Sequence, residues 1–130
     1  MHIPSSIRSF TAAAGLLLAA LASGAAEVPY DKASFDAALA QGKPVIVEFA
    51  ADWCPTCRAQ KPIVQSLLKE AKLQPVTLFN ANFDTEVALK RQLRVGQQST
   101  FVVFKGGKEV ARSTGQTQRE AIADLFDKAL

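Results

Sequence analysis

The stretch Ala51-Asp52-Trp53-Cys54-Pro55-Thr56-Cys57-Arg58 contains the only two cysteines of the 130-residue chain. It lies where a run of strand-forming residues ends and a helical pattern begins. A thiol at the N-terminus of a helix faces unpaired backbone N–H groups and the positive end of the helix dipole, and both favour the thiolate. The sequence therefore predicts that Cys54 attacks a substrate disulfide and that Cys57, one helical turn later, resolves the mixed disulfide.

Two other uses of the cysteine pair are weaker. A structural disulfide between residues three apart closes a very short loop, which constrains the unfolded chain little. A structural zinc site takes four ligands, and the only histidine, His2, lies in a segment that we expect to be removed. A dimer that pools four cysteines is the remaining route to such a site. We therefore expect a redox-active pair and no metal or other cofactor.

Residues 1–26 have the pattern of a signal peptide. Arg8 supplies the positive charge, residues 10–22 are apolar, and residues 23–26 are small. The apolar run is short for a membrane span, and no cysteine follows it that could carry a lipid. We expect cleavage after Ala26, with Ala25 as the near alternative and an uncleaved N-terminal anchor as the other reading. Export to the periplasm follows, a compartment in which disulfides form.

Composition limits the function of the remaining segment, residues 27–130. Its length suits one domain, and we expect a monomer. The whole chain carries a net charge of +3, and removal of the signal peptide takes away one positive side chain, Arg8. So mild an excess gives no argument for binding nucleic acid or a membrane surface.

The pattern along residues 27–130 alternates strands and helices and indicates an α/β fold. Residues 45–50 are β-branched and almost wholly apolar, which is typical of a central strand covered on both faces. The other predicted segments are helices at 31–42, from Cys54 to Leu68 with a kink at Pro62, at 85–93 and at 116–130, strands at 75–81 and 100–104, and a hairpin strand at 108–113. This order predicts a mixed sheet with helices on both faces.

Several of these residues together resemble the thioredoxin family. They are Glu48-Phe49, the run from Trp53 to Cys57, Pro62, the run from Phe104 to Gly107, and Gly115 before the last helix. The resemblance covers nearly all of residues 27–130. It implies a thioredoxin fold, with a central mixed β-sheet in a three-layer α/β/α arrangement, and a thiol:disulfide oxidoreductase whose redox group is the Cys54–Cys57 disulfide.

The resemblance also assigns roles to individual residues. Cys54 matches the nucleophile, Cys57 the resolving thiol and Trp53 the aromatic residue beside them, while Pro55 and Thr56 stand between the cysteines. Glu48 falls where thioredoxins keep a buried carboxylate beneath the active-site helix.

Burial raises the pKa of a carboxyl group, so Glu48 could take the proton of the resolving thiol through water. The alternative is a strand residue whose carboxylate reaches solvent at the end of the sheet. Asn80 occupies the place where many thioredoxins have a lysine near this carboxylate, so we expect the electrostatic tuning to differ.

Ser99 departs from the family pattern, because thioredoxins have a cis-proline at this position, immediately before Thr100. A cis peptide before a non-proline residue costs roughly 2.5–4 kcal/mol, so the loop is either trans or a strained cis form. In the family this loop offers its backbone to an extended substrate, so we expect altered specificity. Loss of the proline also implies an alternative function, a metal or iron–sulfur binding module that uses Cys54 and Cys57.

The residues between the cysteines bear on the direction of exchange. Strong oxidants of this family have a histidine there, which stabilises the thiolate, whereas this chain has Pro55 and Thr56. The chain also resembles exported thioredoxins of cytochrome c maturation and the exported reductase module of a membrane electron carrier. We therefore expect a periplasmic reductase of protein disulfides with a membrane thiol electron donor.

A holding or docking protein with incidental thiols is a third interpretation. Three basic residues, Lys90, Arg91 and Arg94, are expected to form a solvated helix face.

Overall fold

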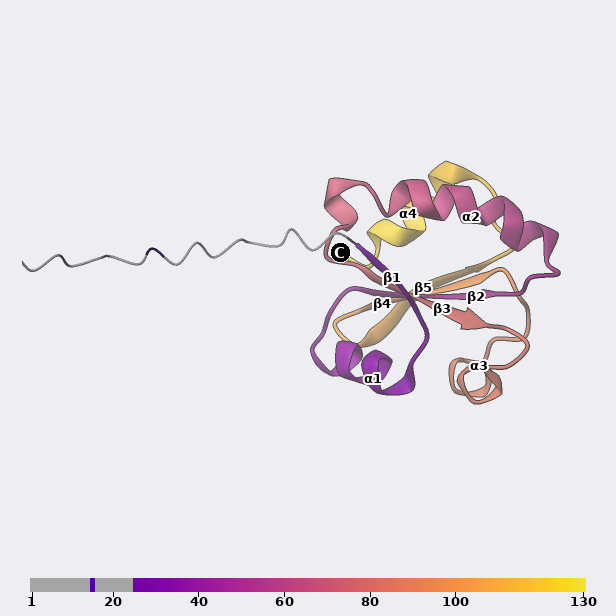
Figure 1. Cartoon of the computed structure of the whole chain (residues 1–130), viewed down its shortest axis with the longest axis horizontal. Helices are drawn as coiled ribbons and strands as arrows, with labels where there is room; N and C mark the ends of the chain where they lie inside the picture. Colours follow the sequence, from indigo (N-terminus) through magenta and orange to yellow (C-terminus); the bar gives the residue numbers. More distant parts are fainter. Residues whose placement is uncertain (1–14, 16–24) are drawn as a thin grey trace, which may run out of the picture.

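The computed structural model describes residue 15 and residues 25–130. A five-stranded sheet with strand order β1-β3-β2-β4-β5 forms the centre of the domain. Strands β1, β3 and β2 are parallel to one another, while β4 and β5 are antiparallel to their neighbours. Figure 1 shows α2 and α4 on one face of this sheet and α1 and α3 on the other. The predicted three-layer thioredoxin fold is confirmed.

The elements follow one another in alternating order along the chain. They are β1 (Ala26–Pro29), α1 (Lys32–Ala40), β2 (Val45–Ala50), α2 (Pro55–Leu67), a 3₁₀ turn (Ala71–Leu73), β3 (Thr77–Asn82), α3 (Val87–Leu93), β4 (Thr100–Lys105), β5 (Lys108–Thr114) and α4 (Arg119–Asp127).

Strand β2 lies at the centre of the sheet, and both of its faces are buried. Ile46 packs with residues of β3, β4, α2 and α4 in one apolar cluster. Val45, Val47 and Phe49 point the other way and pack with Phe35 of α1 in a second cluster. The unbroken apolar run that predicted a central strand is explained by this double burial. The carboxyl end of β2 leads directly into the cysteine motif.

The structure differs from the sequence prediction mainly at the ends of elements. Strand β1 was not predicted, because it is four residues long and mostly exposed and carries no apolar alternation. Helix α3 begins at Val87 instead of residue 85. The Asn82 side chain accepts hydrogen bonds from the N–H groups of Asp84 and Thr85, and this turn occupies the predicted first helical residues.

Helix α4 is also shorter than predicted. The side chain of Gln116 accepts a hydrogen bond from the backbone N–H of Gln118, at 2.9 Å, and the helix begins only at Arg119. A turn thus takes up the first residues of the segment at 116–130, because a glutamine side chain competes with the backbone for the first free N–H groups.

The predicted signal peptide falls almost wholly outside the described residues. Of residues 1–26, the structure describes Gly15, Ala25 and Ala26 alone, so this segment and its cleavage remain a prediction. Within residues 25–130, no helix has both the length and the apolar character needed to cross a membrane.

Candidate active site

Cys54 occupies the N-cap position of α2. Its backbone is extended, with φ −87° and ψ 110°, and its sulfur accepts a hydrogen bond from the N–H of Cys57 at 3.1 Å. Pro55 is the first helical residue, where a missing N–H costs nothing. The predicted contact between a sulfur and the free N–H groups of a helix end is therefore present. This geometry stabilises negative charge on Cys54.

The two cysteines form a disulfide, with their Cα atoms 5.3 Å apart. Both are covered in this oxidised form: Cys54 is 1% exposed and Cys57 is 6% exposed. Ala51 and the partly buried Phe83 pack against the pair.

Trp53 is the most exposed large apolar side chain of the described residues, at 54%. Its indole N–H donates a hydrogen bond to the Asp84 carboxylate, at 2.9 Å, which ties the motif to the turn before α3. Arg58 donates to the backbone carbonyl of Asp52, at 3.0 Å. Pro55 is exposed and Thr56 is half-buried. The exposed surface beside the disulfide thus carries an indole that is held by a hydrogen bond.

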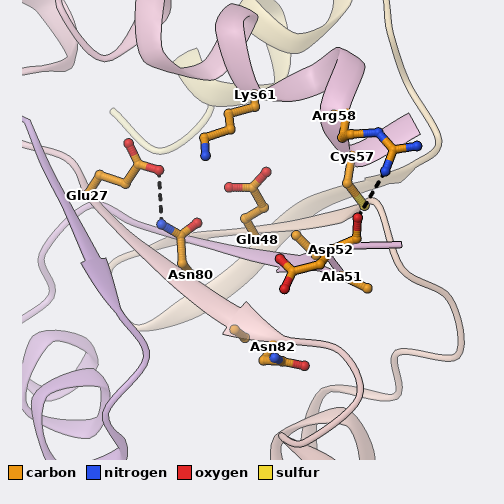
Figure 2. Close-up of a pocket in the computed structure, with 11 residues that line it drawn as sticks. Glu27, Glu48, Ala51, Asp52, Cys57, Arg58, Lys61, Asn80 and Asn82 are labelled. Carbon is orange, nitrogen blue, oxygen red and sulfur yellow. Dashed lines mark hydrogen bonds between the residues drawn. The ribbon is translucent and has the colours of Figure 1, made fainter. Parts of the chain in front are cut away.

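A pocket of about 450 Å³ opens beside the disulfide (Figure 2). Cys57 lines it, so the resolving sulfur is the member of the pair that borders this space. The wall comes from β1, β2, β3 and the first turns of α2, with Glu27, Glu48, Ala50, Ala51, Asp52, Arg58, Lys61, Asn80, Ala81 and Asn82 as the other lining residues.

Glu48 lies in this wall, and its surroundings favour the protonated form of its carboxyl group. It is 5% exposed, so the alternative of a carboxylate reaching solvent at the sheet end is wrong. Burial is the main cause that raises the pKa of Glu48, the nearby carboxylate of Glu27 raises it as well, the ammonium group of Lys61 lowers it, and together they place the pKa at about 7. A carboxyl group that titrates near neutral pH can both accept and return a proton there.

The charges around Glu48 come from segments far apart in the chain. Asn80 faces the pocket from β3 and donates a hydrogen bond to Glu27 of β1, at 2.9 Å. Figure 2 shows Lys61 extending from α2 toward the same space. The positive charge near Glu48 therefore comes from the helix and not from position 80. Sequence reasoning missed Lys61 and Glu27, although Lys61 follows Cys57 by four residues and so shares its helix face.

The loop before β4 resolves the question that Ser99 raised. No cis peptide bond occurs in the described part of the chain, and Ser99 takes a left-handed conformation with φ +55°. For a residue with a Cβ this conformation costs roughly 1–2 kcal/mol. The Ser99 hydroxyl donates to the carbonyl of Gln98, at 2.6 Å, and the Thr100 hydroxyl donates to the carbonyl of Gln97, at 2.9 Å. Ser99 and Thr100 are both buried.

Gln60 of α2 is a site residue that sequence reasoning missed. It is 0% exposed, and its side-chain amide donates to the carbonyl of Gln116 at 2.8 Å and to the carbonyl of Ser99 at 3.4 Å. The signal was present in the sequence, because positions 57, 60, 64 and 67 form the buried stripe of the helix.

The donor set of the described residues does not fit the alternative of a metal or iron–sulfur module. Within residues 25–130, no group of three or more histidine, cysteine, aspartate or glutamate side chains could hold a metal ion. Cys54 and Cys57 supply two thiolates, whereas a zinc or iron–sulfur site needs about four ligands.

Of the basic residues on α3, Arg91 and Arg94 are exposed. The Lys90 ammonium lies 4.0 Å from the centre of the Phe83 ring. Lys90 therefore packs over a residue that borders the disulfide cluster, while the other two basic side chains face solvent. The solvated helix face thus includes Arg91 and Arg94 but only part of Lys90.

Comparison with known proteins decides the family. The family model described as Thioredoxin matches residues 27–128. The chain belongs to the thioredoxin family. A thioredoxin from Chlamydia pneumoniae is 36% identical over 95 residues, which cover 73% of this chain and 90% of that protein. A thioredoxin from Alicyclobacillus acidocaldarius is 33% identical over 96 residues, with the same coverage of both chains.

Solved structures agree with this membership. The structure of Trxlp from Edwardsiella tarda superimposes with a TM-score of 0.76 and 40% identity, over 78% of this chain and 98% of that chain. The thioredoxin of Malassezia sympodialis has the same fold, with a TM-score of 0.72 at 19% identity. Family and geometry together identify this thioredoxin as a thiol:disulfide oxidoreductase that works through Cys54 and Cys57.

Proposed function

We propose that this thioredoxin is an exported reductase of protein disulfides in the periplasm. The observation that carries the proposal is the Cys54 sulfur at the N-cap of α2, which accepts the N–H of Cys57, with Pro55 and Thr56 between the cysteines and no histidine. The N-cap contact makes Cys54 the attacking thiolate. Without a histidine to stabilise the reduced form further, the dithiol remains a good electron donor.

The proposed reaction is a pair of thiol exchanges. The Cys54 thiolate attacks one sulfur of the substrate disulfide, forms a mixed disulfide and expels the other substrate sulfur as a thiolate. Cys57 then loses its proton and attacks the Cys54 sulfur, which releases the second substrate thiolate and leaves the Cys54–Cys57 disulfide. Glu48 takes the Cys57 proton through the pocket that both residues line.

The direction of exchange is tested by the reduction potential of the Cys54–Cys57 couple. We expect a value near that of thioredoxins, about −270 mV. A value near that of strong periplasmic oxidants, about −120 mV, would overturn the reductase assignment and leave the exchange chemistry intact.

A membrane thiol carrier is the proposed electron donor, because a reductase in an oxidising compartment must be reduced again after each turnover. In cells that lack this donor, we expect Cys54 and Cys57 to accumulate as the disulfide. An unchanged thiol content would contradict this part of the proposal.

Substrates are identified by trapping. In the Cys57→Ser variant the mixed disulfide on Cys54 persists, because the resolving thiol is absent. Mass spectrometry of the trapped species names the partner. We expect periplasmic proteins with disulfides, and the absence of any trapped protein in the periplasmic fraction would contradict the proposal.

Export is tested on the same cells. We expect a monomer in the periplasmic fraction whose N-terminus is Glu27. Full-length chain in the membrane fraction would instead support an uncleaved anchor.

A further inference from the structure

The loop at residues 97–100 needs outside support for its conformation. Ser99 has φ +55°, a region that residues with a Cβ avoid unless their surroundings impose it. The loop's own hydroxyl bonds, from Ser99 to Gln98 and from Thr100 to Gln97, join neighbours within the loop. The Thr100 hydroxyl also shares a hydrogen bond with the Thr114 hydroxyl at 2.8 Å, and Thr100 pairs with Phe49 of β2, so the sheet holds the end of the loop that enters β4. None of these contacts reaches α2, the helix that begins at Cys54.

Gln60 makes that connection. Its amide reaches from α2 to two segments, donating to the carbonyl of Gln116 at 2.8 Å and to that of Ser99 at 3.4 Å. The same Ser99 carbonyl accepts the N–H of Gly115 at 2.9 Å. Because α2 begins at the N-cap sulfur of Cys54, this single side chain joins the cysteine helix to the junction of the loop and the segment after β5.

The orientation of the amide follows from its neighbours. Both partners of Gln60 are backbone carbonyls, which only accept hydrogen bonds, so the nitrogen must face them. The Gln60 oxygen then has no partner among the described residues. A fully buried amide with an unpaired oxygen packs less favourably than an apolar side chain of the same size. Packing alone therefore does not explain a glutamine on the buried stripe of α2.

We propose that Gln60 is a positioning residue that fixes the loop of Ser99 relative to α2, the helix that begins at Cys54, and thereby sets the affinity for extended protein substrates. It acts through two backbone carbonyls and touches no reacting atom. Its loss lets the loop move relative to the N-cap sulfur, so a substrate that needs both surfaces binds more weakly. A small disulfide needs only the sulfur and is unaffected. The inference rests on the disulfide exchange activity and is independent of its direction or compartment.

Kinetics of the Gln60→Met variant test this role. Methionine has a similar size and cannot donate the two hydrogen bonds. With insulin as the protein disulfide, we expect KM to rise about fivefold, the effect of losing roughly one hydrogen bond, with kcat unchanged. The rate with a small aromatic disulfide should stay within about twofold. Such a substrate does not bind along the loop, so the lost hydrogen bonds of Gln60 weaken only the binding of an extended chain. Gln65→Met, on an exposed position of the same helix, is the matched control.

Gln60→Leu is the second variant, because leucine is apolar and cannot donate to the carbonyl groups either. We expect the same KM increase with insulin at pH 8. An equal loss with both substrates, a change in kcat alone, or no change in KM would overturn the proposal. Failure of both variants to fold would also overturn it, because Gln60 would then be a stability residue.

Discussion

Two regions of the molecule differ in how they depart from the family pattern. The first is the pocket wall that Cys57 lines, where Glu48 keeps the buried carboxylate while its charged neighbours are Lys61 and Glu27, from α2 and β1. The second is the loop before β4, where a left-handed serine, Ser99, replaces the expected cis-proline. The buried carboxyl group of Glu48 is thus retained beside different charged residues, whereas the loop before β4 has a backbone conformation that differs from the family pattern. Changes in the first region should alter pH dependence, and changes in the second should alter substrate affinity.

The largest effect is expected at the cysteine pair itself. Cys54→Ser should abolish turnover with protein and small disulfides alike, because it removes the attacking sulfur. Cys57→Ser should still react once and then stop at the mixed disulfide. Insulin reduction and mass spectrometry of the adduct measure the two outcomes. Turnover that survives in Cys54→Ser would contradict the assigned roles.

The pocket wall makes a prediction about stability and pH. The folded state holds the Glu48 proton up to about pH 7, whereas the unfolded state loses it near the ordinary value of 4.5. The folded state therefore binds more protons between these values, and the free energy of unfolding falls as pH rises through this window. The full loss is about 3 kcal/mol and is reached above pH 7.

Glu48→Gln should remove this pH dependence, because the buried amide stays neutral. At pH 8 the variant should be more stable than the wild type, by up to about 3 kcal/mol, while its exchange rate falls about 10²-fold. Urea unfolding at pH 5 and pH 8 checks the first part, with Glu120→Gln at an exposed position as the control. A parallel loss of stability at both pH values would show that Glu48 is not titrating.

The two charged neighbours should act in opposite directions. Lys61→Met removes the positive charge that lowers the pKa of Glu48, so Glu48 should titrate at a higher pH in this variant. Glu27→Gln removes a negative charge that raises it, so its titration should move to lower pH. The pH profile of insulin reduction follows both shifts, and Lys69→Met, outside the pocket wall, is the control. Shifts of the same sign in both variants would refute this arrangement.

Substitution of Ser99 in the loop gives the smallest predicted effect on stability. Ser99→Gly should be more stable than Ser99→Ala by about 1 kcal/mol, because glycine accepts φ +55° without a Cβ penalty and alanine does not. Thermal unfolding of the two variants at one pH measures the difference. Equal stability would mean that residue 99 does not hold a left-handed conformation in solution. Neither variant should alter the titration of Glu48, since Ser99 lies outside the pocket wall.

The fold and the reacting residues could be predicted because they rest on local patterns. Two features can be recognised within ten residues of sequence. One is the apolar run of β2, which is buried on both faces, and the other is the spacing of Cys54 and Cys57 at the start of a helix. Glu48 could be predicted as a site residue as well, because it is the one charged residue in the apolar run of β2.

The tuning residues could not be predicted in the same way. Glu27 lies on a four-residue strand without alternation, and its approach to Glu48 depends on β1 and β2 both pairing with β3. Gln60 reads as a polar surface residue unless the helical phase of its stripe is followed. The trans, left-handed form of Ser99 depends on partners at positions 60 and 115, which no local pattern joins.

The central claim is that Cys54 is an activated sulfur at the start of α2, and its alkylation rate tests that claim most directly. In the reduced Cys57→Ser variant, Cys54 is the only cysteine. The account predicts that iodoacetamide modifies it at pH 7 at least about tenfold faster than free cysteine, because the thiolate is the nucleophile. A rate equal to that of free cysteine would contradict the account.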